Sequence, residues 1–231
     1  MFLIYKFPIQ ISINIANFLF SWSRNRKKKN KATLLPPSTK VYESFTWNRC
    51  LQPLADISGC QVLAYDRLGS GLTERVLDGQ FYTRKSEELL ASELLNQLNI
   101  SNNMHIVSSS SGADVAFEIA IARPDLIQSI IFVVRYNLIN VQHSFGLTHF
   151  LSFKNSYFNE NIARDDGTRE SYLKPIRDDP LFLNSFVLFT QNYVTSSTIN
   201  EWYKLSNKLK ILIIIGEHDK NSIKRKYSRI L

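Results

Sequence analysis

Several apolar runs of strand length alternate with helix-forming segments along this chain. They are residues 60–65, 105–109, 129–134 and 209–215, and the segments 87–98 and 113–122 between them have helical spacing. Strands that are apolar along their whole length, without alternation, are typical of parallel sheets covered on both faces. The chain is therefore predicted to be an α/β protein with a mostly parallel sheet and helices on both of its faces.

The helices between these runs carry their own start and stop signals. Ser86, followed by Glu87 and Glu88, is suited to cap a helix and to place carboxylates at its positive end. Residues 113–122 end at Arg123-Pro124, where proline disfavours a helical conformation of its predecessor. A further helix is predicted over residues 45–56, before Gly59.

The net charge of +8 is concentrated at the amino terminus. Residues 1–31 hold seven Lys and Arg and no acid, and removing these seven from +8 leaves +1 for residues 32–231. A nucleic-acid-binding face on the globular part is therefore not expected. The two cysteines, Cys50 and Cys60, form no disulfide framework and have no metal-ligand spacing, which favours a reducing compartment.

The segment 2–22 is apolar but interrupted by polar residues. Its polar positions recur at helical spacing, and the basic residues 24–31 follow, which indicates an amphipathic helix on a membrane surface, with a cytoplasmic basic flank. The alternative is that this segment begins the globular domain as a strand or helix, followed by a solvated basic loop. If no membrane is bound, a cytoplasmic location is expected.

Two domain boundaries follow from composition. Leu34-Leu-Pro-Pro-Ser38 is interpreted as an extended linker, which divides a 1–33 segment from a domain at 34–231. Between about 135 and 208 the chain is rich in Phe and Tyr and has no clear strand, which predicts an inserted helical lid.

Four serines stand at the junction between the run 105–109 and the following helix. Only one register, Ser108-x-Ser110-x-Gly112, places a serine on a tight strand-to-helix turn with small residues two positions before and after it. Such a turn exposes the hydroxyl at a positive helix end. The alternative is that these hydroxyls merely cap the helix.

Three segments, in this order along the chain, resemble the α/β-hydrolase family: Tyr65-Asp-Arg-Leu-Gly-Ser-Gly-Leu-Thr73, His105 to Gly112 with the helix that follows it through Arg123-Pro124, and Leu212-Ile-Ile-Ile-Gly-Glu-His-Asp219. The resemblance, to lid-bearing serine hydrolases, runs from about Phe45 to Leu231. It implies that Ser110 is the nucleophile, that the Ser111 N–H is an oxyanion donor, and that Asp219 orients a catalytic histidine. It also implies structural roles for Ser108 and Gly112 in the turn, and for Asp66, Gly69 and Gly71 in the glycine-rich loop.

The sequence departs from the family at two places. Only twelve residues follow Asp219, whereas one more helix and strand, after which the family's histidine would come, need about twenty-five. The segment 35–44, where the family has a His-Gly oxyanion motif, contains neither residue. Both departures suggest a truncated copy or a non-catalytic relative.

Two functions are therefore compared. One is a serine hydrolase that cleaves an apolar ester or related acyl substrate through an acyl-enzyme at Ser110. The other is a membrane-tethered binding protein that has lost the chemistry. No cofactor is expected, because Gly69-Ser-Gly71 lacks the dinucleotide fingerprint, and no metal is expected, because His218 and Asp219 have no further ligands at usable spacing.

Overall fold

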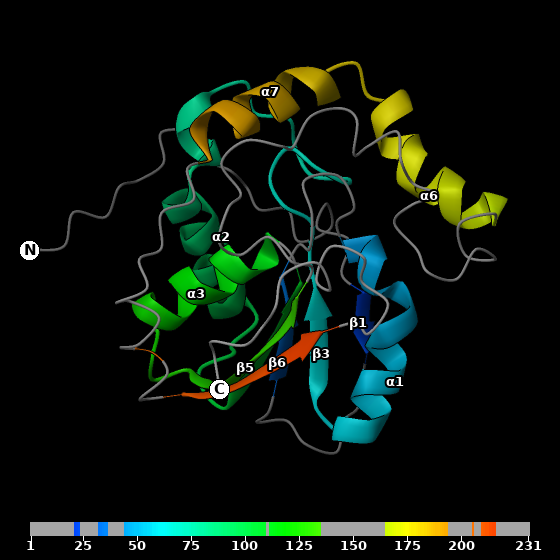
Figure 1. The fold of residues 1–231 in the computed structure, drawn as a ribbon. Helices are drawn as coiled ribbons and strands as arrows, with labels where there is room; N and C mark the ends of the chain where they lie inside the picture. Colours follow the sequence, from blue (N-terminus) through cyan, green and yellow to red (C-terminus); the bar gives the residue numbers. More distant parts are fainter. Residues whose placement is uncertain are drawn as a thin grey trace, which may run out of the picture.

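The computed structural model describes residues 21–23, 32–36, 44–109, 111–134, 165–193, 205 and 209–215. Within these residues, six strands form one sheet in the order β1-β3-β2-β4-β5-β6 (Figure 1). They are β1 (Ser21–Ser23), β2 (Ala32–Leu35), β3 (Gln61–Ala64), β4 (Met104–Ser109), β5 (Ile127–Val134) and β6 (Lys210–Ile215). β1 is antiparallel to β3, and all other pairs are parallel. The predicted fold class is confirmed.

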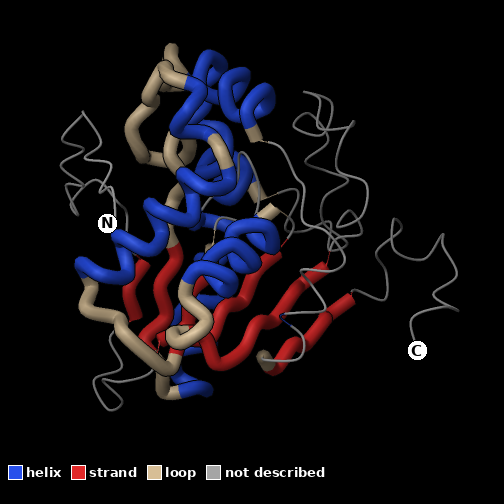
Figure 2. Tube along the Cα trace, turned by 90° about the vertical axis from the view of Figure 1, so that its left-hand side faces the viewer, coloured by secondary structure: helices blue, strands red, loops and turns tan. Residues whose placement is uncertain are grey.

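Helices cover both faces of the sheet, which is why its strands lack alternation. α1 (Asn48–Ser58) lies on one face, and α2 (Arg84–Gln97) and α3 (Gly112–Ala122) lie on the other, in front of the strands in Figure 2. Within β4, Met104 and Ile106 pack in the core beneath α2 and α3, whereas Val107 packs with the cluster that α1 covers.

Two further helices, α6 (Asp166–Arg177) and α7 (Phe182–Asn192), lie beyond the end of the sheet toward which the parallel strands point (Figure 1). They fall within the stretch 135–208, for which we predicted a helical lid. The division of the chain into a domain and a lid stays a prediction, because residues 135–164 lie outside the described part.

Strand β2 corrects the predicted linker. Leu34 pairs in parallel with both β3 and β4, and Leu35 pairs in parallel with β3. Both side chains are buried, so the boundary expected after residue 33 falls inside a strand. Proline holds its predecessor in an extended conformation, which a strand end also requires, so Pro36 is compatible with either structure. The apolar run of β2 was too short to be distinguished from a linker.

Strand β1 places Ser21–Ser23 in the sheet. This agrees, for these three residues, with the alternative that the segment 2–22 begins the globular domain. The predicted amphipathic helix at 2–20 and the basic run 24–31 lie outside the described residues. In the part of the chain that the structure describes, no helix has the length and apolar character to cross a membrane.

Helix α2 begins three residues earlier than predicted. Thr83 is its cap, and the Thr83 hydroxyl accepts a hydrogen bond of 3.1 Å from the Ser86 N–H. Ser86 therefore lies inside the first turn instead of capping it. The cap was misplaced because Thr and Ser are both good capping residues and stand three positions apart.

Candidate active site

The strand-to-helix turn after β4 is short. β4 ends at Ser109 and α3 begins at Gly112, so only two residues connect them. Ser111 has right-handed helical dihedral angles (φ −64°, ψ −15°), and its carbonyl accepts a hydrogen bond from Asp114. Ser110 itself lies outside the described residues. The elements on either side of Ser110 are those that a nucleophile elbow requires.

Ser108 points away from this turn. Because side chains alternate along a strand, Ser108 shares the face of Met104 and Ile106, beneath α3. It is fully buried, and its Oγ has no hydrogen-bond partner among the described residues. Ser108 thus places under the helix a buried hydroxyl that has no partner in the described part of the chain.

We expect Ser108→Ala to raise the free energy of unfolding by about 1 kcal/mol, since a buried hydroxyl without a partner costs that much or more. Urea unfolding measures the change. Ser109→Ala, on the other face of the strand, is the matched control and is expected to have little effect. A loss of stability in Ser108→Ala would mean that the hydroxyl is satisfied in the folded protein.

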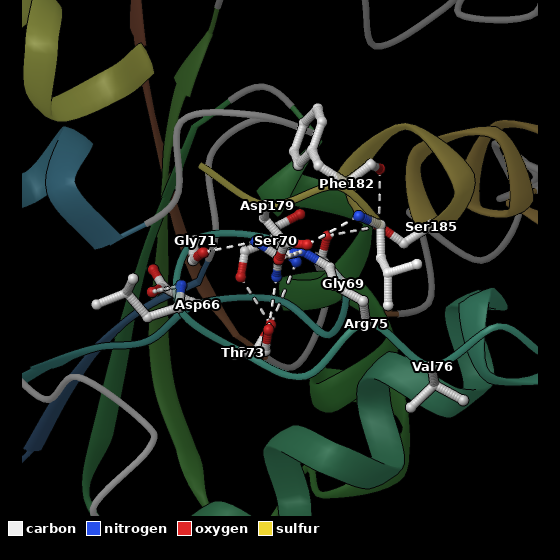
Figure 3. A network of polar contacts seen from close by, with 12 residues as sticks. Asp66, Gly69, Ser70, Gly71, Thr73, Arg75, Val76, Asp179, Phe182 and Ser185 are labelled. Carbon is white, nitrogen blue, oxygen red and sulfur yellow. Dashed lines mark hydrogen bonds and ion pairs between the residues drawn. The ribbon is translucent and has the colours of Figure 1, made fainter. Parts of the chain in front are cut away.

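The glycine-rich loop that follows β3 is organised around the buried Asp66 (Figure 3). Its Oδ1 accepts a hydrogen bond from the Ser44 N–H (2.8 Å), and its Oδ2 accepts one from the Leu72 N–H (3.2 Å). Gly71 lies against this carboxylate with φ +52°, and Gly69 has φ +77° against the Tyr82 ring. Both glycines adopt left-handed conformations where a side chain would collide with a neighbour.

The segment between β2 and α1 is fixed at both ends. The Trp47 indole donates a hydrogen bond of 3.1 Å to the Pro36 carbonyl, and Ser44 is held by Asp66. Because β2 pairs with β4, this segment leaves the sheet beside the elbow strand. Residues 37–43, where a second oxyanion donor would be sought, lie outside the described part. No local sequence pattern indicates the contact between Trp47 and Pro36.

Buried charges gather behind the elbow helix. Arg67 Nε lies 2.7 Å from Glu87 Oε1, and Arg84 pairs with Glu118. Asp114, in the first turn of α3, faces the same group: burial raises the pKa of its carboxyl, and Arg84 and Arg67 oppose that rise. No local sequence pattern predicts this cluster, since its members come from the loop after β3, from α2 and from α3.

The described residues contain one histidine, and it is remote from the elbow. His105 is the second residue of β4, at the end of the strand away from the turn, and its Nδ1 lies 2.8 Å from the Ser129 hydroxyl. Four residues of strand, 106–109, lie between it and the turn, a length of about 13 Å. Asp219 and the other histidines, His143, His149 and His218, lie outside the described part. Among the described residues no group of potential ligands could hold a metal ion.

Solved structures share this architecture. The α/β hydrolase MGS-M2, from a Medee basin deep-sea metagenome library, has a TM-score of 0.58 at 15% identity, over 86% of this chain and 85% of that one. Haloalkane dehalogenase DpaA from Paraglaciecola agarilytica NO2 has a TM-score of 0.58 at 14% identity, over 85% and 70%. Est816, described as an N-acyl homoserine lactone degrading enzyme, has a TM-score of 0.55 at 11% identity, over 86% of this chain and 88% of that one.

No protein-family model and no curated protein matches the chain. The structural neighbours named above are hydrolases, and their folds match this one over 85–86% of the chain. The chain has the α/β-hydrolase fold.

Proposed function

We propose that this chain is a serine hydrolase that cleaves an ester or related acyl bond, with Ser110 as the nucleophile. The observation that carries the proposal is the two-residue connection between β4 and α3, at the carboxyl edge of a parallel sheet. This is where the fold supports a nucleophile, because the turn is tight and the positive end of a helix begins there.

In the proposed reaction, the Ser110 hydroxyl loses its proton to a base and attacks the substrate carbonyl carbon. The Ser111 N–H donates a hydrogen bond to the oxyanion, and collapse of the intermediate releases the alcohol, which takes up the proton. Water then attacks the acyl-enzyme in the same way and releases the acid. Asp219 would orient the base, and none of the described histidines is suited to be that base.

The aromatic residues of 135–208 do not, where described, favour a substrate-lining role. Phe182, Phe189 and Tyr193 are buried in contact with the glycine-rich loop and the short helix η2 (Gly79–Tyr82). Phe186 is half-buried and stacks on Phe182, with ring centroids 6.0 Å apart. The preference for an apolar substrate is therefore part of the acyl-hydrolase proposal and is not supported by these side chains.

A fluorophosphonate probe tests the proposal on the full chain. Its phosphorus forms a bond to Ser110 Oγ with loss of fluoride, and mass spectrometry locates the adduct. We expect Ser110→Ala to abolish labelling, whereas Ser109→Ala and Ser111→Ala, which keep their backbone N–H groups, retain it. Labelling that survives Ser110→Ala would reject the assignment.

The alternative is a non-catalytic binding protein, tethered to a membrane surface through residues 2–31. A serine without a base is a poor nucleophile, and His105, the histidine in the described part of the chain, lies at the end of β4 away from the turn. A folded protein, shown by its circular dichroism and cooperative unfolding, that takes up no probe would support it. Co-sedimentation with anionic vesicles would test the tether separately.

A further inference from the structure

Helix α7 packs on the segment 67–82, which includes the glycine-rich loop. Its buried face consists of Phe182, Ser185, Phe189 and the following Tyr193, at spacings of three, four and four. An arginine of this segment meets a ring at each end of α7: Arg75 lies 5.8 Å from the Phe182 ring centroid, and Arg67 contacts the Phe189 and Tyr193 rings. The two ends differ in the exposure of the ion pair that each arginine makes.

The amino-terminal end is held by a partly exposed ion pair (Figure 3). Arg75 Nε lies 3.0 Å from Asp179 Oδ2, and the Asp179 side chain is 31% exposed. Arg75 is anchored independently of α7, because its Nη1 and Nη2 donate hydrogen bonds to the Thr73 and Gly71 carbonyls. Close by, the Ser185 hydroxyl donates a bond of 3.1 Å to the Gly69 carbonyl. Asp179 can therefore leave without disturbing the arginine's bonds to the loop.

The carboxyl-terminal end is held by a buried cation. The Arg67 guanidinium lies 4.6 Å from the Phe189 ring centroid and 5.3 Å from that of Tyr193, and the two rings stack on each other. The Arg67 side chain is only 1% exposed and pairs with Glu87 of α2. Separating this end would expose two aromatic rings and a buried ion pair, whereas separating the amino-terminal end would expose one ring, Phe182, and part an ion pair that solvent already reaches at Asp179. The carboxyl-terminal end is therefore the more costly one to separate.

We propose that α7 opens from its amino-terminal end, with the Arg75–Asp179 pair as a salt-sensitive latch and the Arg67 contact as the pivot. Opening would lift Phe182 from Arg75 and Ser185 from Gly69, and would uncover the glycine-rich loop at the carboxyl edge of the sheet. Salt weakens the latch because the screening length falls from about 10 Å at 0.1 M to about 3 Å at 1 M. The pivot, being buried, is screened much less. The inference does not depend on hydrolase activity.

Hydrogen exchange of the full chain, followed by mass spectrometry, tests the order of opening. Asp179→Asn removes the charge but keeps an oxygen that can accept from the Leu181 N–H. We expect it to speed exchange around Ser185 about two- to fivefold, the effect of losing one partly exposed ion pair, with the Tyr193 amide unchanged. High salt should also speed exchange around Ser185 in the unsubstituted protein, and it should speed this exchange little further in Asp179→Asn.

Matched variants separate the latch from general loosening. Asp178→Asn alters the neighbouring carboxylate, which is exposed and pairs with Arg177 of α6, and should leave α7 unchanged. Tyr193→Leu removes a ring from the pivot and should speed exchange along the whole helix, whereas Tyr193→Phe keeps the ring and should not. Peptides from β4 and β5 report any global unfolding. Equal exchange in Asp179→Asn and Asp178→Asn, or earlier opening at Tyr193 than at Ser185, would overturn the proposal.

Discussion

Gly71→Ala is expected to lower the free energy of unfolding by about 3–5 kcal/mol. A left-handed conformation costs an alanine about 1–2 kcal/mol, and φ at this position is +52°. The added Cβ would also overlap the Asp66 carboxylate at Oδ2, which must then give up its bond to the Leu72 N–H. Each charge-assisted hydrogen bond contributes about 1.5–3 kcal/mol. Urea unfolding measures the loss.

Gly79→Ala is the control for this prediction. Its Cβ would meet the amide end of the Asn192 side chain, which can rotate away, so a change of less than about 1 kcal/mol is expected. A double-mutant cycle with Asp66→Ala separates the two causes. In the Asp66→Ala background, Gly71→Ala should cost only the backbone term. A full loss in that background would show that the collision with Asp66 is not what matters.

The sequence predicted the elements whose signals are local. The run 105–109, the helix that follows and the small residues around Ser110 lie together in the chain, so the strand, turn and helix could be inferred from one window. β2 could not, because four residues before a pair of prolines carry too little pattern. What identifies β2 as a strand is its pairing with β3 and β4, which are distant in sequence.

The contacts that shape the candidate site are long-range, and no periodicity reveals them. Ser185 binds the Gly69 carbonyl across 116 positions, and Ser44 is held by Asp66 across 22. The resemblance to a known family suggested that Asp66 has a structural role but not which N–H groups it binds. The charges around Arg67 were likewise unforeseen, since charged side chains are mostly exposed and a sequence gives no reason to bury them.

The second large effect is expected on replacing Arg67, whose side chain is buried. Arg67→Met should lower the free energy of unfolding by about 3–5 kcal/mol, because it leaves Glu87 buried without the partner 2.7 Å away. It also removes the cation from between α2 and the Phe189 and Tyr193 rings. Chemical unfolding at neutral pH measures the loss, and Arg177→Met, in an exposed pair, should leave the unfolding midpoint unchanged.

The double variant Arg67→Met/Glu87→Met decides what the pair contributes. Removing both charges avoids leaving the Glu87 carboxylate buried after the loss of the Arg67 cation. The free energy of unfolding of the double variant should therefore exceed that of Arg67→Met by about 1–3 kcal/mol. The stability of the double variant itself can be measured even if Arg67→Met does not fold. If the double variant were as unstable as Arg67→Met, the lost cation–ring contacts would account for the damage. The stability of this region would then come from the docking of α7 on Arg67 and not from the Arg67–Glu87 ion pair.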